Sequence, residues 1–376
     1  MNLTARPQPV LRIEEVTTDA GFALLREPWN ALVERTDGNV FLRHEWFAAA
    51  WAWRRSQASL WILCAYAESR LVGVLALMQA RDAPHRGRPL QFLSVPDAQW
   101  CDLLADPGFG PAVGTALVEH LLSNAPQWDQ LCLDRLPAGS AVQTWLAPAL
   151  VDKGVAAHFE AIDSNPFVDL SAPWADYLGT LSRGIKKTRN LAANRLARAG
   201  VAEVEWVTSM NASREQVQSA LEKMVAISAR SWKRATGNSL EAPGPNAFVR
   251  ALTDAAHAQG WLSLWFLHLD GVAVAMEYQL MNKGVVYALR ADFDDAHRSL
   301  CTGTFLNFHM LEELFDTPLA RYCMGPGNNP YKSRWSRSAE SLTIMTCYAP
   351  TMRGRAGALW SEVKPKLRTL RDRLAS

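Results

Sequence analysis

An order of strands and helices that occurs twice is the feature that most constrains the fold of this chain. In the first half, apolar runs at 61–67 and 71–78 flank the polar turn Glu68-Ser69-Arg70, which is typical of a β-hairpin. In the second half, apolar runs at 261–269 and 272–281 flank Asp270-Gly271, so the two hairpins begin about 200 residues apart. Each hairpin is followed by another strand, a helix and a final strand. The repeat predicts an α+β fold of two tandem domains, each with a mixed, mostly antiparallel sheet flanked by helices.

The other predicted elements place a domain boundary near the segment Ser171-Ala-Pro-Trp174. Helices are predicted at 28–34, 42–52, 111–122, 181–199, 213–235, 246–259 and 303–315. Further strands are predicted at 90–95, 130–133, 157–162, 167–170, 285–290 and 320–324. We therefore expect an N-terminal domain over 1–170, a C-terminal domain with the functional site over 171–350, and a C-terminal helix over 351–376.

Composition argues against several classes of protein. The chain has 376 residues, of which 49% are hydrophobic, and a formal net charge of +2. This length suits two domains with substantial cores, and the balanced charge argues against a surface devoted to nucleic acid. The six cysteines are scattered without metal-ligand spacing, so we expect no metal and a reducing compartment. The N-terminus lacks the apolar core of a signal peptide and no run approaches ~20 apolar residues, which predicts a cytoplasmic protein without a membrane span.

The loop at 297–304 precedes a predicted helix and is a candidate phosphate site. Gly303 lets the backbone approach a phosphate closely, and the free N–H groups of a helix start favour an anion. Arg298 can add a charge-assisted contact, and Thr302 and Thr304 flank the glycine. The alternative is an ordinary strand-to-helix turn, because one glycine is a weak signal.

The segment 325–335, Gly-Pro-Gly-Asn-Asn-Pro-Tyr-Lys-Ser-Arg-Trp, follows the last predicted strand. Glycines at a strand end splay the chain where clefts form in α/β sheets. Tyr331 can donate a proton to a leaving group, and Lys332 can hold a carboxylate, a phosphate or an oxyanion. Arg334 is a candidate for binding substrate. The alternative is a turn whose aromatic rings pack on the core while its cations are solvated.

Glu277 lies in the middle of an apolar strand. A carboxylate there must be paired or functional if it faces the interior, and it could accept a proton from an amine nucleophile. Tyr287 and Arg290, on the next hairpin strand, could line the same cleft. The alternative is a polar position that faces solvent.

A second candidate acid, Asp102, lies in a loop of the first half beside Trp100. It could act as a base or bind the amine of an acceptor in the groove between the domains, and Trp100 could contact the substrate. Asp97 competes with it for this role. A solvated loop aspartate is the simpler alternative.

The predicted helix between the two domains is strongly basic. Its cationic residues are Arg183, Lys186, Lys187, Arg189, Arg195 and Arg198. We favour a solvated helix face, and a surface that meets phosphate or RNA is the alternative.

Five motifs in order resemble the GNAT superfamily, and within it the cellulose-biosynthesis-type acetyltransferase branch, which is related to the Fem peptidyltransferases. The resemblance extends over residues 30–350. The motifs are Phe41-Leu-Arg-His-Glu-Trp46 with Trp51, the basic stretch from Ser182 to Gly200, Trp232 with Gly237, Leu267-His-Leu-Asp-Gly-Val-Ala-Val-Ala275, and Gly325 with Tyr331-Lys332 and Trp335.

This resemblance implies two GNAT-like domains and transfer of an acyl group, most simply acetyl, from acyl-CoA. The acceptor would be an amine or hydroxyl of a sugar, amino acid or peptide. In such enzymes a glycine-rich loop binds the pyrophosphate of coenzyme A, and residues 298–303 occupy that place here. Arg290 would also contact the cofactor. Tyr331 falls near the family's general acid, while Lys332 and the backbone at 288–290 would stabilise the oxyanion.

One departure from the family leaves the donor open. The superfamily loop has two glycines, whereas Leu300-Cys-Thr-Gly303 has one. The Fem relatives use aminoacyl-tRNA, which the basic helix would suit. A non-catalytic GNAT-like subunit in polysaccharide biosynthesis is the other alternative.

Overall fold

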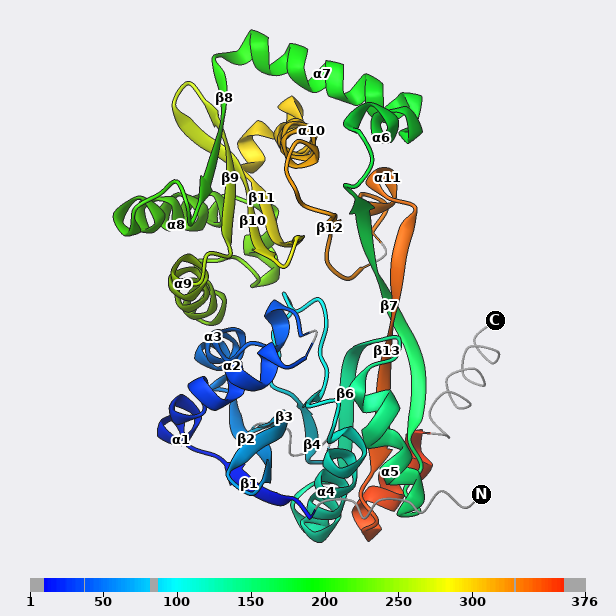
Figure 1. Ribbon diagram of the computed structural model, residues 1–376. Helices are drawn as coiled ribbons and strands as arrows, with labels where there is room; N and C mark the ends of the chain where they lie inside the picture. Colours follow the sequence, from blue (N-terminus) through cyan, green and yellow to red (C-terminus); the bar gives the residue numbers. More distant parts are fainter. Residues whose placement is uncertain (1–9, 37, 82–86, 328, 362–376) are drawn as a thin grey trace.

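The computed structural model describes residues 10–36, 38–81, 87–327 and 329–361 (Figure 1). The strands are β1 Arg12–Val16, β2 Ala58–Ala67, β3 Arg70–Ala80, β4 Pro89–Phe92, β5 Leu104–Ala105, β6 Gln130–Pro137, β7 His158–Asp169, β8 Ala202–Thr208, β9 Leu262–Leu269, β10 Val272–Asn282, β11 Val285–Phe293, β12 Arg321–Cys323 and β13 Ser338–Tyr348. The helices are α1 Asp19–Leu24, α2 Arg26–Glu34, α3 His44–Arg54, α4 Gly110–Ser123, α5 Ala147–Asp152, α6 Trp174–Thr180, α7 Arg183–Ala199, α8 Arg214–Ala229, α9 Pro243–Ala258, α10 Thr302–Phe315 and α11 Lys332–Trp335. Shorter helical turns are η1 Val40–Leu42, η2 Ala125–Gln127, η3 Val142–Leu146, η4 Trp232–Thr236 and η5 Asp295–Leu300.

The predicted repeat is present in the structure. In the first half, β2 and β3 form a hairpin, β3 pairs antiparallel with β4, and β4 pairs parallel with β6. In the second half, β9 and β10 form the hairpin, β10 pairs antiparallel with β11, and β11 pairs parallel with β12. The helices α4 and α10 occupy the same place in the two orders. The fold is therefore α+β with two similar units in tandem, as predicted.

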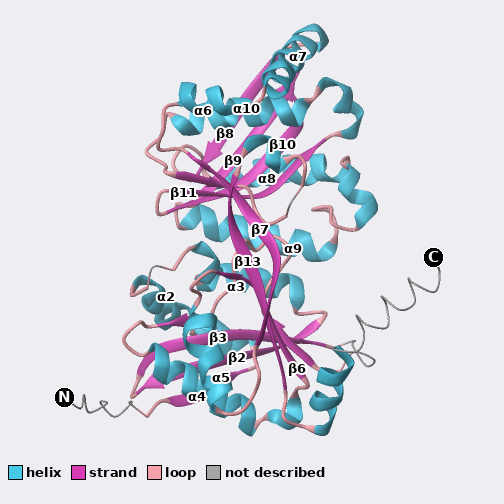
Figure 2. Ribbon diagram, turned by 90° about the vertical axis from the view of Figure 1, so that its right-hand side faces the viewer, coloured by secondary structure: helices cyan, strands magenta, loops and turns pink. Residues whose placement is uncertain are grey.

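Two long strands join the units. β7 and β13 pair antiparallel with one another, and β13 also pairs with β6 while β7 also pairs with β12. Figures 1 and 2 show both strands running from one half of the molecule into the other. Through them, the described strands form one continuous sheet in the order β1-β2-β3-β4-β6-β13-β7-β12-β11-β10-β9-β8, with β5 beside β3.

Some element predictions were wrong. The two strands predicted at 157–162 and 167–170 are parts of one strand, β7, because β13 pairs with β7 along nearly its whole length. The pairing continues across a register shift between Leu342 and Thr343. The strands β1, β5, β8 and β13 were not predicted. The predicted helix at 351–376 is helical over 352–361, and the rest of it lies outside the described residues.

The two halves also meet through helices. α3 packs on α9, where Phe248 lies 5.3 Å from Trp46 and 6.0 Å from Trp53, ring centre to ring centre. A Cβ on Gly244 would lie 2.2 Å from Nε1 of Trp53, so only glycine permits this approach. Within the described residues, no helix combines the length and the apolar character that crossing a bilayer requires.

Candidate functional site

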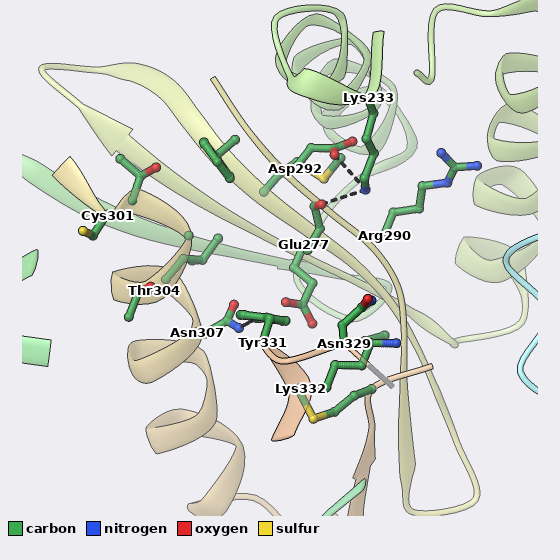
Figure 3. A pocket seen from close by; sticks show the side chains of 18 of the residues that line it. Lys233, Glu277, Arg290, Asp292, Cys301, Thr304, Asn307, Asn329, Tyr331 and Lys332 are labelled. Carbon is green, nitrogen blue, oxygen red and sulfur yellow. Dashed lines mark hydrogen bonds and ion pairs between the residues drawn. The ribbon is translucent and has the colours of Figure 1, made fainter. Parts of the chain in front are cut away.

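A cavity of about 730 Å³ opens where β11 and β12 separate. The two strands pair over Val285–Tyr287 and Arg321–Cys323, and beyond this point the edge of β11 turns toward the cavity. A bulge accompanies the separation, because Tyr278 faces Arg290 and Gln279 faces Ala288, which leaves Leu289 without an opposite residue on β10. Residues of β11 from 288 to 293, the start of α10, and residues 329–332 form much of the wall (Figure 3).

The N-terminus of α10 faces this cavity. Cys301 has a left-handed backbone, with φ 59°, and turns the chain from η5 into the helix. It stands where the superfamily loop has its other glycine, and it adopts a conformation that favours glycine. Thr302 is buried and its Oγ1 has no partner among the described residues, while Gly303 and Thr304 also line the cavity. Together these groups form a place for an anion at a helix start.

Arg298 lies at the same end of the cavity. Its guanidinium is 3.0 Å from Asp295 and stands 5.8 Å from the centre of the Phe293 ring. The Asp295 pair is exposed, so the guanidinium can turn toward a phosphate at little energetic cost. The five predicted cofactor contacts, Arg290, Arg298, Thr302, Gly303 and Thr304, all line this one cavity.

Glu277 also lines the cavity and is buried. The Tyr322 hydroxyl donates to Glu277 Oε1 at 2.6 Å, and Gln279 Nε2 donates to the same oxygen at 2.9 Å. Burial raises the pKa of the Glu277 carboxyl, although both hydrogen bonds favour its charged form. A carboxyl with a raised pKa holds a proton more tightly than an ordinary glutamate and is a stronger base.

Tyr331 reaches the cavity from the loop before α11. The residue is 39% exposed, but its hydroxyl points inward, where Asn307 Nδ2 of α10 donates to it (Figure 3). Burial raises the pKa of this hydroxyl, so that it keeps its proton at neutral pH. A protonated hydroxyl therefore lies at the cavity wall.

Lys332 holds the glycine loop beside Tyr331. Its Nζ donates to the carbonyl oxygens of Gly325 and Pro326, each at 2.7 Å. Gly325 and Gly327 have φ of 79° and 119°, which suits glycine and bends the chain around the ammonium. Burial lowers the pKa of Lys332 to about 8. Two of its three N–H groups serve the loop, and no further acceptor for the protonated amine lies among the described residues.

Several polar residues of the cavity were not predicted from the sequence. Lys233 Nζ lies 2.8 Å from Asp292 Oδ1 and donates to the Ala291 carbonyl at 2.9 Å, so a buried ion pair borders the edge of β11. Asn307 and Tyr322 hold Tyr331 and Glu277. A signal for Lys233 was its place directly after Trp232 in a motif shared with the family. Asn307 and Tyr322 carry no comparable local signal.

Arg290 joins the cavity to the first half of the chain. Its Nε and Nη2 each lie 2.8 Å from a carboxylate oxygen of Asp97, and Nη1 donates to the Asn238 carbonyl at 2.7 Å. In Figure 3 Arg290 points away from Glu277 and Tyr331. Its guanidinium is therefore paired with Asp97, the residue that competed with Asp102 as the candidate acid of the first half.

A second residue of the same loop supports β11 from the other side of the gap. Gln99 Nε2 donates to the Ala288 carbonyl at 2.9 Å and to the Cys323 carbonyl at 3.4 Å, while Asn165 donates to Gln99 at 3.2 Å. Gln99 is fully buried. A side chain from the first half thus bridges β11 and β12 at the point where the two strands begin to separate.

Four predicted site residues do not line the cavity. Asp102 points into the first half, where it accepts hydrogen bonds from the backbone N–H groups of Leu103, Ala141 and Val142 at 2.8 to 3.0 Å. Burial raises its pKa to about 6. Trp100 and Tyr287 are buried and pack edge to face, 5.5 Å apart, because both fill the core between the halves. Arg334 is exposed and precedes the buried Trp335.

Replacing Asp102 with alanine is expected to lower stability and leave turnover unchanged. Two N–H groups at the start of η3, those of Ala141 and Val142, and the N–H of Leu103 would lose their acceptor, which costs about 1–3 kcal/mol. Urea unfolding measures the loss, and Asp152→Ala, at an exposed position on α5, is the matched control. A loss of turnover in a protein of unchanged stability would return Asp102 to the mechanism.

Comparisons with known proteins agree with the geometry. A family model described as "Acetyltransferase (GNAT) domain" matches residues 185–333, which contain the cavity and the loop at 297–304. No curated protein matches the chain by sequence.

Solved structures share the fold across most of the chain. A conserved protein of unknown function from Bacteroides thetaiotaomicron VPI-5482 has 11% identity and a TM-score of 0.55, and the match covers 90% of this chain and 100% of that chain. A C-terminal domain of the DUF2156 type from Agrobacterium fabrum has 15% identity and a TM-score of 0.53, covering 91% and 96%. FemX has 11% identity and a TM-score of 0.52, covering 88% and 96%. Residues 185–333 therefore match the GNAT acetyltransferase domain that the motifs resemble, and the chain shares its fold with FemX.

Proposed function

We propose that the protein is an acyltransferase that uses acyl-CoA, most simply acetyl-CoA, and an acceptor amine or hydroxyl of a sugar, amino acid or peptide. The observation that carries this proposal is a single cavity with an anion site at the start of α10, a free strand edge at β11, and two groups that can move protons, Glu277 and Tyr331. When bound, acyl-CoA supplies the acyl group as a thioester. Gly303, Thr304, Arg298 and Thr302, whose Oγ1 has no partner in the described part of the chain, fit its phosphates.

The proposed roles of the residues follow from their environments. Glu277 accepts the proton of the attacking amine, since its pKa is raised and it lies in the wall. Tyr331 returns a proton to the departing sulfur, because its hydroxyl stays protonated at neutral pH. Lys332 and the β11 backbone hold the reacting carbonyl oxygen. Arg290 positions β11 through Asp97 and has no free fork for the cofactor.

The proposed location of the protein depends on its cysteines. All six cysteines are free thiols in the structure, which fits a reducing compartment such as the cytoplasm.

Ligand-induced stabilisation tests the donor. Thermal unfolding is measured with coenzyme A, with acyl-CoA thioesters of graded length, and with aminoacyl-tRNA. We expect a saturable rise in Tm with the thioesters. Arg298→Ala should weaken the rise, and Arg334→Ala is the control because Arg334 does not line the cavity. Absence of binding by every thioester would contradict the proposal and would favour the non-catalytic alternative.

One observation favours an aminoacyl-tRNA donor as a second candidate. Arg195 of the basic helix α7 donates to the Ser299 carbonyl at 2.7 Å and so places that helix against the loop before α10. Under this alternative RNA binding should fall steeply with salt, and neutralising Lys186, Lys187 and Arg189 should reduce both the affinity and the salt slope. Binding of RNA without this salt dependence would count against it.

Replacing Tyr331 with phenylalanine is expected to lower kcat/KM about 10²-fold, because the leaving group loses its proton donor. Steady-state kinetics with the best thioester measure the effect, and circular dichroism checks the fold. Tyr348→Phe is the matched control, since its hydroxyl contacts Gln130 in the first half. Turnover of Tyr331→Phe equal to that of the control would remove Tyr331 from the mechanism.

A further inference from the structure

A second, smaller cavity lies in the first half at the position that corresponds to the large one. β4 and β6 pair in parallel over three residues, Pro89–Gln91 with Gln130–Cys132, and then separate, as β11 and β12 do. A cavity of about 180 Å³ opens directly beyond the last pair, against Phe92, residues 94–96 and residues 134–135. In place of a helix N-terminus, its cationic groups are two arginines, Arg54 and Arg135.

The two guanidinium groups are fixed side by side. Arg54 Nε donates to the Ser94 carbonyl at 2.8 Å. Arg135 Nη1 donates to Ser94 Oγ and to the Val95 carbonyl, each at 3.1 Å. Both side chains therefore hold the same strand end and cannot move apart freely. Burial and the charge of Arg135 lower the pKa of Arg54, as expected for like charges placed together.

The backbone of Arg135 is shaped for this placement. Its φ is 57°, in the left-handed region that non-glycine residues seldom adopt. It lies in a β-bulge, because Leu133 and Leu136 of β6 face Met345 and Thr343, so that Asp134 and Arg135 stand opposite the single residue Ile344. Bulges of this kind redirect side chains near functional sites. Ile344 itself lines the cavity, so the bulge directs Arg135 along its wall.

The cavity carries an excess positive charge. Besides the two arginines, its only charged lining residue within the described chain is Asp134, which is 38% exposed and lies 3.9 Å from Arg135 Nη1. Asp97, the next acid along the loop, is already paired with Arg290. Arg54 Nη1 and Nη2 and Arg135 Nη2 have no hydrogen-bond acceptor among the described residues, so donors of both guanidinium groups remain for a ligand.

We propose that Arg54 and Arg135 form a binding site for a small oxyanion, such as phosphate or the phosphate or carboxylate group of a larger ligand. Guanidinium forks bind such groups through paired, charge-assisted hydrogen bonds. The site is separate from the anion site at α10, since it lies at the strand separation of the other half. It also adjoins the loop that holds β11 through Asp97 and Gln99.

Calorimetric titration with inorganic phosphate at constant ionic strength tests the site. We expect saturable binding by the wild-type protein that chloride does not reproduce. Arg54→Gln and Arg135→Gln should each weaken it at least about tenfold, as the loss of a hydrogen bond to a charged group does. Arg54→Lys keeps the charge and loses the planar guanidinium, so its affinity for phosphate should lie between those of the wild type and Arg54→Gln. The control is Arg55→Gln, an exposed neighbour that should bind as the wild type does.

A further variant separates the two anion sites. If Arg298→Gln abolishes phosphate binding while folded Arg54→Gln binds normally, the phosphate occupies the α10 site and the proposal is overturned. Absence of saturable binding by the wild type also overturns it. Arg54→Gln decides the matter if Arg135→Gln does not fold. Steady-state kinetics distinguish the two sources of the anion. If added phosphate raises the KM of the acceptor, the site binds an anionic group of the acceptor. If this KM does not change, the site binds a free anion.

Discussion

Replacing Glu277 with glutamine is expected to lower kcat/KM about 10²- to 10⁴-fold, the usual contribution of a general base. Glutamine has nearly the same shape and still accepts the hydrogen bond from Tyr322, so the variant should keep its fold. It cannot accept the proton of the acceptor amine. The matched control is Glu119→Gln on α4, an exposed position in the first half.

The pH dependence separates this role from a structural one. In the wild type, kcat/KM should rise with pH as Glu277 loses its proton, and the midpoint should lie above that of an ordinary glutamate because burial raises the pKa. The variant should lack this limb. If kcat/KM of Glu277→Gln still rises with pH at the same midpoint, the titrating group is not Glu277.

Stability should change with pH in the opposite sense. The folded protein binds the Glu277 proton more tightly than the unfolded chain does, because its folded pKa is raised. The contribution to stability is therefore complete below the unfolded pKa and is lost as pH rises through the folded pKa. The wild type should lose free energy of unfolding relative to Glu277→Gln over that range. A difference that does not vary with pH would indicate that the carboxyl is not buried in solution.

The sequence predicted best those features that local signals determine. The hairpins follow from turn residues such as Asp270-Gly271, which both take positive φ, and from the apolar runs on either side. Local signals were enough to predict the loop at 297–304, Tyr331, Lys332 and Glu277. Each lies in a loop, at a strand end or in an apolar strand whose sequence is unusual by itself. The structure brings all of them to one cavity.

Features that depend on distant partners could not be predicted in this way. β13 pairs with β6 and β7, which precede it by more than a hundred residues, and its own sequence gives only a weak strand pattern. Arg290 was expected at the cofactor, but its carboxylate partner lies 193 positions earlier. The loop of Asp102 and Trp100 was expected to face the groove. Instead its acid turns back to cap η3, an outcome that depends on where η3 packs.

Replacing Asp97 with alanine is expected to lower the free energy of unfolding by about 3–5 kcal/mol, because it leaves the Arg290 guanidinium buried without a counter-charge. Only 3% of the Arg290 side chain and 7% of the Asp97 side chain are exposed. Urea unfolding measures the change. Glu14→Gln, which breaks the exposed pair with Arg12, should cost no more than about 1 kcal/mol.

The double variant Asp97→Leu/Arg290→Met distinguishes an unpaired charge from lost packing. Because it removes both charges and keeps apolar volume, it should be more stable than Asp97→Ala. Its turnover should nevertheless stay low, since β11 would lose the tie from the first half that sets the edge of the cavity. A double variant as unstable as the single one would show that packing, rather than the ion pair, joins the two halves here. Full turnover in a stable double variant would show that β11 keeps its position without Asp97, through Gln99 and the sheet alone.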